Sequence, residues 1–354
     1  MEIRKVIREV LNEIDWPDTF SDVSQVCVPP KDIIDYLNRV IANAPKKTKD
    51  REKFATKYPF IHSKSTFLNK DETEVNINEF IERITQEPSN IINKGSKLSK
   101  SGGFNEHVYK TGVPALRGIV YDIKNKKFHF INTCPGAGSC VAICYARKGN
   151  FIRYSESYDL MTRRLNLLLN NPSRYEEKMY NELESLAKEH KALKGYKSKV
   201  IIRWNDSGDF FAKKYVDIVN SVMQKLDDEG YNVESYAYTK VANVASGSDF
   251  KTVFSSGANK RESGKIDTSK YENAVVVPKE VFKDLDLMKI HDEQVLKARI
   301  AERFGVDKNL VITYDEMLYT PKEDYPAWHV IVTPNDGDDA AFRKDVKTIF
   351  LTEH

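Results

Sequence analysis

Hydrophobic residues along this chain change their spacing near residue 100, and the change predicts two regions. Before that point, apolar residues recur at helical spacing in three segments, residues 3–14, 33–41 and 77–84. This spacing places them on one face of an α-helix. Gly, Ser and Lys replace the periodic pattern over residues 93–103, which is typical of a connection between units. We therefore expect a mainly helical N-terminal region over residues 1–95 and an α/β domain over residues 96–354.

Short apolar runs alternate with helix-spaced segments in the second region. Strands are expected at residues 119–123, 128–131, 199–204, 233–238, 252–255, 274–277 and 310–313. Helices are expected at residues 154–165, 179–186, 215–226 and 295–304. Alternation of strands and helices is typical of parallel sheets built from βαβ units. The pattern therefore predicts an α/β fold, either a partial parallel barrel or an open parallel sheet.

A loop rich in cysteine follows the strand expected at residues 128–131. Cys134, Cys140 and Cys144 have the spacing Cys-x5-Cys-x3-Cys, with Pro-Gly-Ala-Gly-Ser between the first two. Three thiolates on one loop can bind three irons of a [4Fe-4S] cluster, or three positions of a tetrahedral zinc ion. A tightly packed turn of metal-free cysteines is the third interpretation. The fourth cysteine, Cys27, has apolar neighbours and is interpreted as a buried side chain.

Polar residues also follow the next two expected strands. The first set comprises Asn205, Asp206, Ser207, Gly208 and Asp209, and the second comprises Thr239 and Lys240. The carboxyl ends of parallel strands meet at one edge of a sheet, where ligands bind. We therefore expect these residues to line a cofactor pocket with the cysteine loop as one wall. Each set also has a simpler interpretation, since residues 205–209 suit a turn before a helix and Lys240 can extend into water.

Charge is distributed unevenly, although the net charge of the chain is only +3. Between residues 46 and 70 the basic residues are Lys46, Lys47, Lys49, Arg51, Lys53, Lys57, Lys64 and Lys70. Only Asp50 and Glu52 oppose them, and four aromatic residues are interleaved, Phe54, Tyr58, Phe60 and Phe67. This Lys46–Lys70 region either binds a phosphate backbone and stacks bases, or forms a solvated surface whose aromatic residues pack inward.

Length and composition are those of a soluble globular protein. The chain has 354 residues, of which 40% are hydrophobic and 30% are charged. No apolar segment is long enough to cross a bilayer, and the first residues lack the apolar core of a secretory signal. We expect a cytoplasmic protein that does not associate with membranes.

Three motifs together resemble a family of uncharacterised bacteriophage-encoded proteins. They are Thr133-Cys-Pro-Gly-Ala137 with Cys144-Tyr-Ala146, Arg203-Trp-Asn-Asp-Ser-Gly-Asp-Phe-Phe211, and Tyr236-Ala-Tyr-Thr-Lys240. Their order and spacing also resemble a divergent radical S-adenosylmethionine (radical SAM) domain, a superfamily whose usual cysteine spacing is Cys-x3-Cys-x2-Cys. If the chain is phage-encoded, its expected location is the cytoplasm of the host cell.

The radical SAM resemblance implies a function for the predicted pocket. Cys134, Cys140 and Cys144 would bind a [4Fe-4S] cluster. Ser207, Gly208 and Asp209 would line the site of S-adenosylmethionine, with radical chemistry on an unknown substrate. The alternative from the residues alone is a non-enzymatic module that binds nucleic acid or a host protein, in which zinc, or no metal, holds the cysteine loop.

Overall fold

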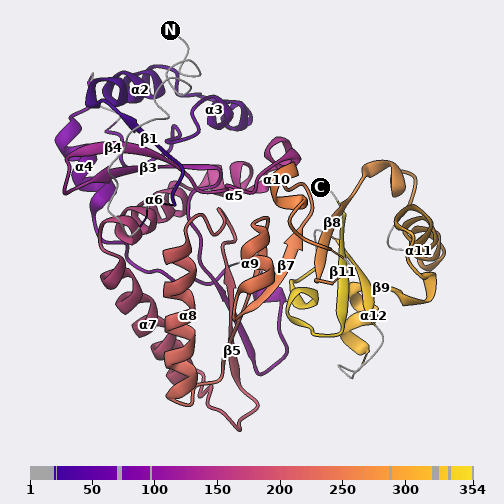
Figure 1. Cartoon of the computed structure of the whole chain (residues 1–354). Coiled ribbons are helices and arrows are strands. Elements are labelled where there is room, and N and C mark those ends of the chain that lie inside the picture. The colour runs from indigo at the N-terminus through magenta and orange to yellow at the C-terminus, as the bar shows by residue number, and fades with distance from the viewer. Residues whose placement is uncertain are drawn as a thin grey trace.

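An eight-stranded parallel sheet forms the centre of the computed structural model, which describes residues 20, 22–69, 74–95, 98–268, 270–286, 289–320, 327–333 and 336–352. Its strands are β2 (Glu106–Lys110), β5 (Lys199–Trp204), β6 (Val233–Thr239), β7 (Lys251–Ser255), β8 (Asn273–Val277), β9 (Val311–Thr313), β10 (Trp328–Val332) and β11 (Val346–Thr352). Their order across the sheet is β2-β5-β6-β7-β8-β11-β10-β9. The sheet is open, so the predicted α/β class is confirmed in its open-sheet form (Figure 1).

Alternate residues of the central strands enter two different hydrophobic cores. In β5, Ile202 packs with side chains of α7 (Pro172–Glu189) and α8 (Lys213–Asp228), which lie side by side over one face (Figure 1). Its neighbour Ile201 packs on the other face with residues of α12 (Tyr314–Tyr319). Because both faces are covered, residues 200–202 of the strand are a continuous apolar run, and this run made the strand predictable.

A second, three-stranded antiparallel sheet lies beside the first. Its order is β1 (Gln25–Val28), β4 (Lys127–Asn132) and β3 (Arg117–Asp122). Helices α2 (Pro30–Ala42) and α4 (Ile77–Thr85) share a hydrophobic core with β3 and β4. These two helices and the strands β3 and β4 are confirmed predictions.

The N-terminal region differs in part from expectation. Strand β1 was not predicted, and its pairing with β4 places the partly buried Cys27 opposite His129. The helix predicted at residues 3–14 lies outside the described residues. The division into residues 1–95 and 96–354 stays a prediction.

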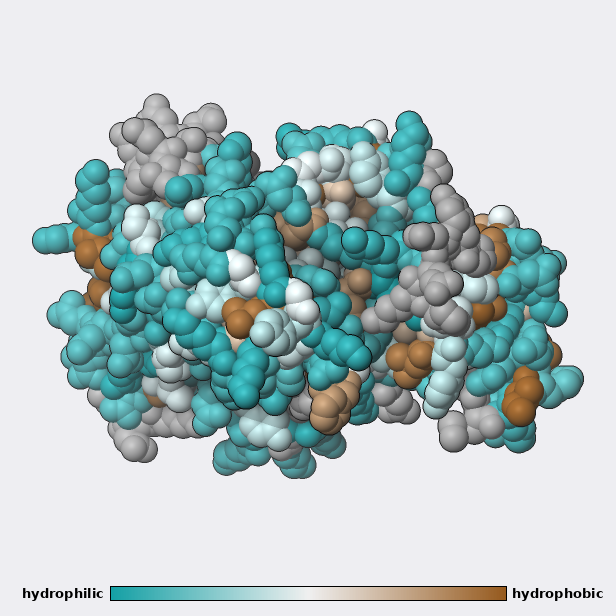
Figure 2. Space-filling model, turned by 90° about the horizontal axis from the view of Figure 1, so that it is seen from below, coloured by the Kyte–Doolittle hydropathy of each residue, from teal (hydrophilic) through white to brown (hydrophobic). Residues whose placement is uncertain are grey.

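The remaining helices connect the strands. They are α3 (Arg51–Lys57), α5 (Asn150–Arg153), α6 (Ser155–Asn170), α9 (Ala242–Gly247), α10 (Lys260–Ser263) and α11 (Ile290–Phe304). Within the described ranges, no helix is long and apolar enough to cross a membrane. The face seen in Figure 2 is mainly hydrophilic, and its hydrophobic residues are separated from one another.

Candidate functional site

The polar strand ends predicted from the sequence meet at the carboxyl edge of the large sheet. Asp209, in the turn after β5, accepts hydrogen bonds from Thr239 Oγ1 at 2.7 Å and from the backbone N of Lys240 at 2.9 Å. Lys240 in turn donates from Nζ to Ser255 Oγ, at the end of β7, at 2.8 Å. The ends of three adjacent strands are therefore linked through side chains.

The cysteine loop reaches this edge by an unexpected route. It begins after β4, a strand of the small antiparallel sheet, whereas we had expected it to follow a strand of the parallel sheet. It then crosses to the end of β7, where Gly138 N donates to Gly257 O at 2.9 Å and Asn259 N donates to Gly136 O at 2.9 Å. The route depends on the pairing of β1 with β4 and on the hydrogen bonds of the loop with residues 257–259, which join parts of the chain that are distant in sequence. The hydrophobic pattern carries no information about such contacts.

Two glycines allow the loop to approach the strand ends closely. A Cβ atom on Gly136 would lie 2.2 Å from the backbone O of Lys240, and one on Gly138 would lie 2.7 Å from the backbone O of Ala258. Any larger residue would displace the loop or the strand ends, because the atoms in the way belong to the backbone. The segment Pro-Gly-Ala-Gly-Ser thus positions the thiols.

The first thiol is held by a strained residue. Leu116 N donates to Cys134 Sγ at 3.2 Å, and Leu116 has a φ of +63°. A leucine in this left-handed region costs about 1–2 kcal/mol, so the surrounding structure must enforce it. Leu116 also accepts a hydrogen bond at its O from Thr133 N at 3.2 Å. Hydrogen bonds at both the N and the O of Leu116 therefore fix the backbone beside the Cys134 sulfur.

Burial and neighbouring charge determine the protonation of the thiols. Burial raises the pKa of Cys134, and the Asp209 carboxylate and the Cys144 thiolate raise it further. Burial also raises the pKa of Cys144, with a further contribution from Cys140. The positive charge of Lys240 opposes both shifts. Cys144 therefore lies within range of the charge of another thiol on either side, and Lys240 and Arg147 are the cations that act on it.

Three cysteine thiols are a donor set that both iron–sulfur clusters and zinc sites use. Clusters are held by Cys thiolates and are tuned by hydrogen bonds to sulfur, and the Leu116 amide supplies such a bond. A single zinc ion requires its ligands to converge on one point. Within the part of the chain that the structure describes, no three His, Cys, Asp or Glu side chains are placed to hold one metal ion.

The turn after β5 consists of Asn205, Asp206, Ser207, Gly208 and Asp209, all of which lie at the carboxyl edge. Asn205 has a φ of +55°, and its Oδ1 accepts from Tyr215 OH at 3.0 Å. Asp206 forms an ion pair with Lys110. Asn205 Nδ2 and Ser207 Oγ are buried and have no hydrogen-bond partner among the described residues. Buried polar atoms are almost always bonded, so these two are candidates for contact with a ligand or water.

Asp209 links the turn to β6. Its carboxylate accepts the two hydrogen bonds described above and a third from Phe210 N at 2.8 Å. Burial raises its pKa, and these hydrogen bonds partly offset that effect. Most of its accepting capacity is used within the protein, so it positions the turn relative to Thr239 and Lys240.

Sequence reasoning missed a group of residues at the same edge. Tyr145, directly after Cys144, donates from its hydroxyl to the backbone O of Asp206. Arg203 Nη2 donates to the Tyr145 hydroxyl at 3.3 Å, and Nη1 pairs with Asp338. Asp338 lies 135 positions from Arg203 in the sequence, and no local signal connects them. This group ties the third cysteine to the turn after β5.

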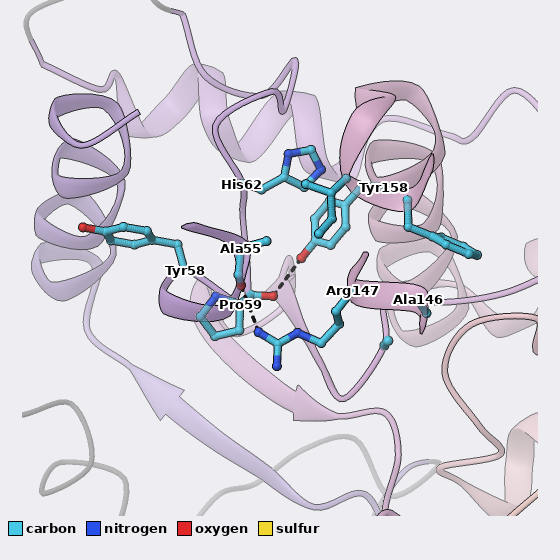
Figure 3. A pocket seen from close by; sticks show the side chains of 10 residues that line it. Ala55, Tyr58, Pro59, His62, Ala146, Arg147 and Tyr158 are labelled. Carbon is cyan, nitrogen blue, oxygen red and sulfur yellow. Dashed lines mark hydrogen bonds between the residues drawn. The ribbon is translucent and has the colours of Figure 1, made fainter. Parts of the chain in front are cut away.

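A small cavity lies behind the loop (Figure 3). Its volume is about 20 Å³, and it is lined in part by His62, Arg147 and Tyr158. Arg147 Nη2 donates to Ala55 O at 2.9 Å, which joins the loop to α3. The cavity has room for a single water molecule and is too small for a substrate.

The open parallel sheet, with polar groups and thiols at its carboxyl edge, places the protein in the α/β class, in which ligands commonly bind at that edge. A family model described as Gene product 88 matches residues 89–327, which include the cysteine loop and both polar strand ends. The chain belongs to this family, which fits the predicted phage-type resemblance. No curated protein and no solved structure matches the chain.

Proposed function

We propose that this chain is a phage-type metalloenzyme whose Cys134, Cys140 and Cys144 hold a [4Fe-4S] cluster. The observation that carries the proposal is the placement of the cysteine loop, which Gly136 and Gly138 seat against the ends of β6 and β7. A cluster at that place would lie beside the turn after β5, at the edge where ligands of parallel sheets bind. Such a group supplies electrons one at a time.

The neighbouring residues support S-adenosylmethionine as the second component. Its polar amino-acid part requires hydrogen-bonding groups and charge, which the turn at residues 205–209 and the Lys240 ammonium offer. Ser207 Oγ and Asn205 Nδ2 are buried donors without partners among the described residues. Thr239 and Asp209 hold the Lys240 backbone in place. We assign radical chemistry on an unknown substrate to this pocket.

Anaerobic reconstitution with iron and sulfide tests this assignment. The reconstituted protein should acquire the visible charge-transfer absorption of a thiolate-bound cluster, and C134A/C140A/C144A should not. Addition of S-adenosylmethionine should change the electron paramagnetic resonance spectrum of the reduced cluster, and S207A should weaken that response. If a cluster forms but its electron paramagnetic resonance spectrum does not change when S-adenosylmethionine is added, the S-adenosylmethionine assignment is refuted and the cluster assignment stands.

The second candidate is a non-enzymatic module that binds nucleic acid or a host protein, in which zinc or no metal holds the loop. It is favoured by the hydrogen bonds that hold the loop without any metal, such as Gly138 N to Gly257 O at 2.9 Å. A protein that contains zinc or no metal when purified without oxygen would favour this candidate.

A further inference from the structure

Two basic segments that are distant in sequence come together beside the cysteine loop. Helix α3 contacts the residues that follow Cys144. Arg147 Nη2 donates to Ala55 O at 2.9 Å and to Thr56 O at 3.3 Å, and Gly149 N donates to Glu52 Oε1 at 3.4 Å. Figure 3 shows Arg147 extended toward this part of the chain. The basic Lys46–Lys70 region is therefore continuous with the far end of the cysteine loop.

The joined surface concentrates positive charge. Residues 46–57 contain six basic and two acidic residues, and residues 144–154 contain three basic residues and no acidic one. Together they carry more positive charge than the whole chain, whose net charge is +3, so the remainder is net negative. A concentration of this kind attracts a polyanion.

Five exposed side chains form what we call the basic rim: Lys49, Lys53, Lys57, Lys148 and Arg153. Within the described residues, none of the five forms an ion pair with a carboxylate. Some exposed lysines elsewhere do so, for example Lys188 with Glu184 at 2.7 Å and Lys213 with Asp217 at 2.7 Å. The rim therefore offers cations that the protein itself does not neutralise.

The aromatic residues available at this surface differ from those predicted. Phe54, Tyr58, Phe60 and Phe67 are buried in the N-terminal core and cannot stack on a base. Tyr145 and Tyr154 are 52% and 51% exposed, and they flank the segment that carries Lys148 and Arg153. Lys70, the last basic residue of the predicted region, lies outside the described residues.

We propose that the basic rim binds the phosphate backbone of single-stranded nucleic acid and that Tyr154 and Tyr145 stack on its bases. Unpaired cations beside exposed aromatic rings suit single strands, whose backbone needs neutralisation and whose bases are free to stack. Tyr145 adjoins Cys144, so a base stacked there lies next to the thiols. Binding itself requires no metal and does not depend on the proposed function. Only the further step, that the bound nucleic acid is the substrate of the radical chemistry, rests on the proposed function.

Fluorescence anisotropy with a labelled single-stranded oligonucleotide and its duplex tests the proposal, across a range of salt concentrations. The wild-type protein should prefer the single strand and lose affinity as salt rises. K53E/K57E and K148E/R153E should each weaken binding about tenfold and lower the salt slope by about 1.4, the value for two lost contacts. Y154A should weaken binding about tenfold without changing the slope, because stacking releases no counterions.

The matched control is K191E/K197E, which changes two exposed lysines in the loop before β5, at the opposite edge of the sheet. It should bind like the wild-type protein. The proposal is overturned if the rim variants match this control, if wild-type binding is absent or insensitive to salt, or if polyglutamate of equal charge competes as well as the oligonucleotide. The last result would assign the rim to an acidic protein.

Metal content measured on the same samples separates this proposal from the proposed function. Suppose that the metal-free protein binds the oligonucleotide, that the rim variants weaken this binding as predicted, and that reconstitution yields no iron. These results would refute only the cluster. Iron in a protein that binds no oligonucleotide would refute only the nucleic-acid proposal.

Discussion

Two arginines near the large sheet, the buried Arg343 and the partly buried Arg203, use their guanidinium groups differently. Arg343, before β11, donates from Nε to Asp345 at 2.8 Å, pairs with the same carboxylate through Nη2, and donates from Nη1 to Met317 O at 2.6 Å. Arg203, at the end of β5, pairs with Asp338, but its Nε has no hydrogen-bond partner among the described residues. Complete pairing is typical of a structural group, and an unpaired buried donor is typical of a site that awaits a partner.

Replacement of each of these two arginines by lysine should have the largest effect on the free energy of unfolding, and it tests the comparison most directly. R343K removes several charge-assisted hydrogen bonds in a buried place and should lower the free energy of unfolding by about 3–5 kcal/mol. R203K leaves a cation beside Asp338 but loses the hydrogen bond to Tyr145 and the stacking on the Tyr238 ring. It should cost less than R343K, about 1–2 kcal/mol. Urea unfolding of both variants measures the difference. Equal losses would remove the distinction between a structural and a functional arginine.

The next effect concerns the loop that carries the thiols. In G136A the new Cβ would meet the backbone of Lys240, and the resulting overpacking should cost about 1–3 kcal/mol. It should also lower the iron bound on reconstitution, because the displaced loop moves the thiols. G247A is the control, since nothing lies within 4 Å of a Cβ at Gly247, the last residue of α9. Normal iron content in G136A would contradict the positioning role.

The smallest effect concerns pH and the cavity behind the loop. His62 is 3% exposed, and burial, aided by Lys64 and Arg51, lowers its pKa from 6.5 to about 4. Since the unfolded state binds the proton more tightly, this group costs stability as the pH falls from 6.5 toward 4. The loss between pH 7 and pH 5 should be about 2 kcal/mol.

Urea unfolding at these two pH values, compared with the same measurement on H62Q, isolates the histidine. The variant should lose less stability over that interval. An identical pH dependence in the two proteins would show that His62 is not held neutral.

The sequence predicted the sheet best where burial is complete. The apolar run of β5 contains Val200, Ile201 and Ile202, all fully buried, and both of its limits agree with the prediction. Strand β2 was missed because it lies at the edge of the sheet and mixes polar residues with two buried ones. Strands β10 and β11 contain apolar runs typical of buried strands, yet our sequence prediction did not include them.

The positions of the candidate site residues in the fold were predicted in part. Residues 205–209 and Lys240 were placed correctly at the strand ends, because parallel strands bring their carboxyl ends together. The path of the cysteine loop from the small sheet, and the contacts of Arg203 with Tyr145 and Asp338, depend on tertiary packing. Such contacts join residues far apart in the chain, and hydrophobic spacing carries no information about them.

Iron and sulfide analysis of protein purified without oxygen tests the central claim most directly. The account predicts iron and acid-labile sulfide together in the wild-type protein and in C27A, whose changed cysteine lies in β1. It predicts neither in C134A/C140A/C144A. Zinc in place of iron, or equal iron in the wild-type protein and the triple variant, would contradict a [4Fe-4S] cluster at this loop.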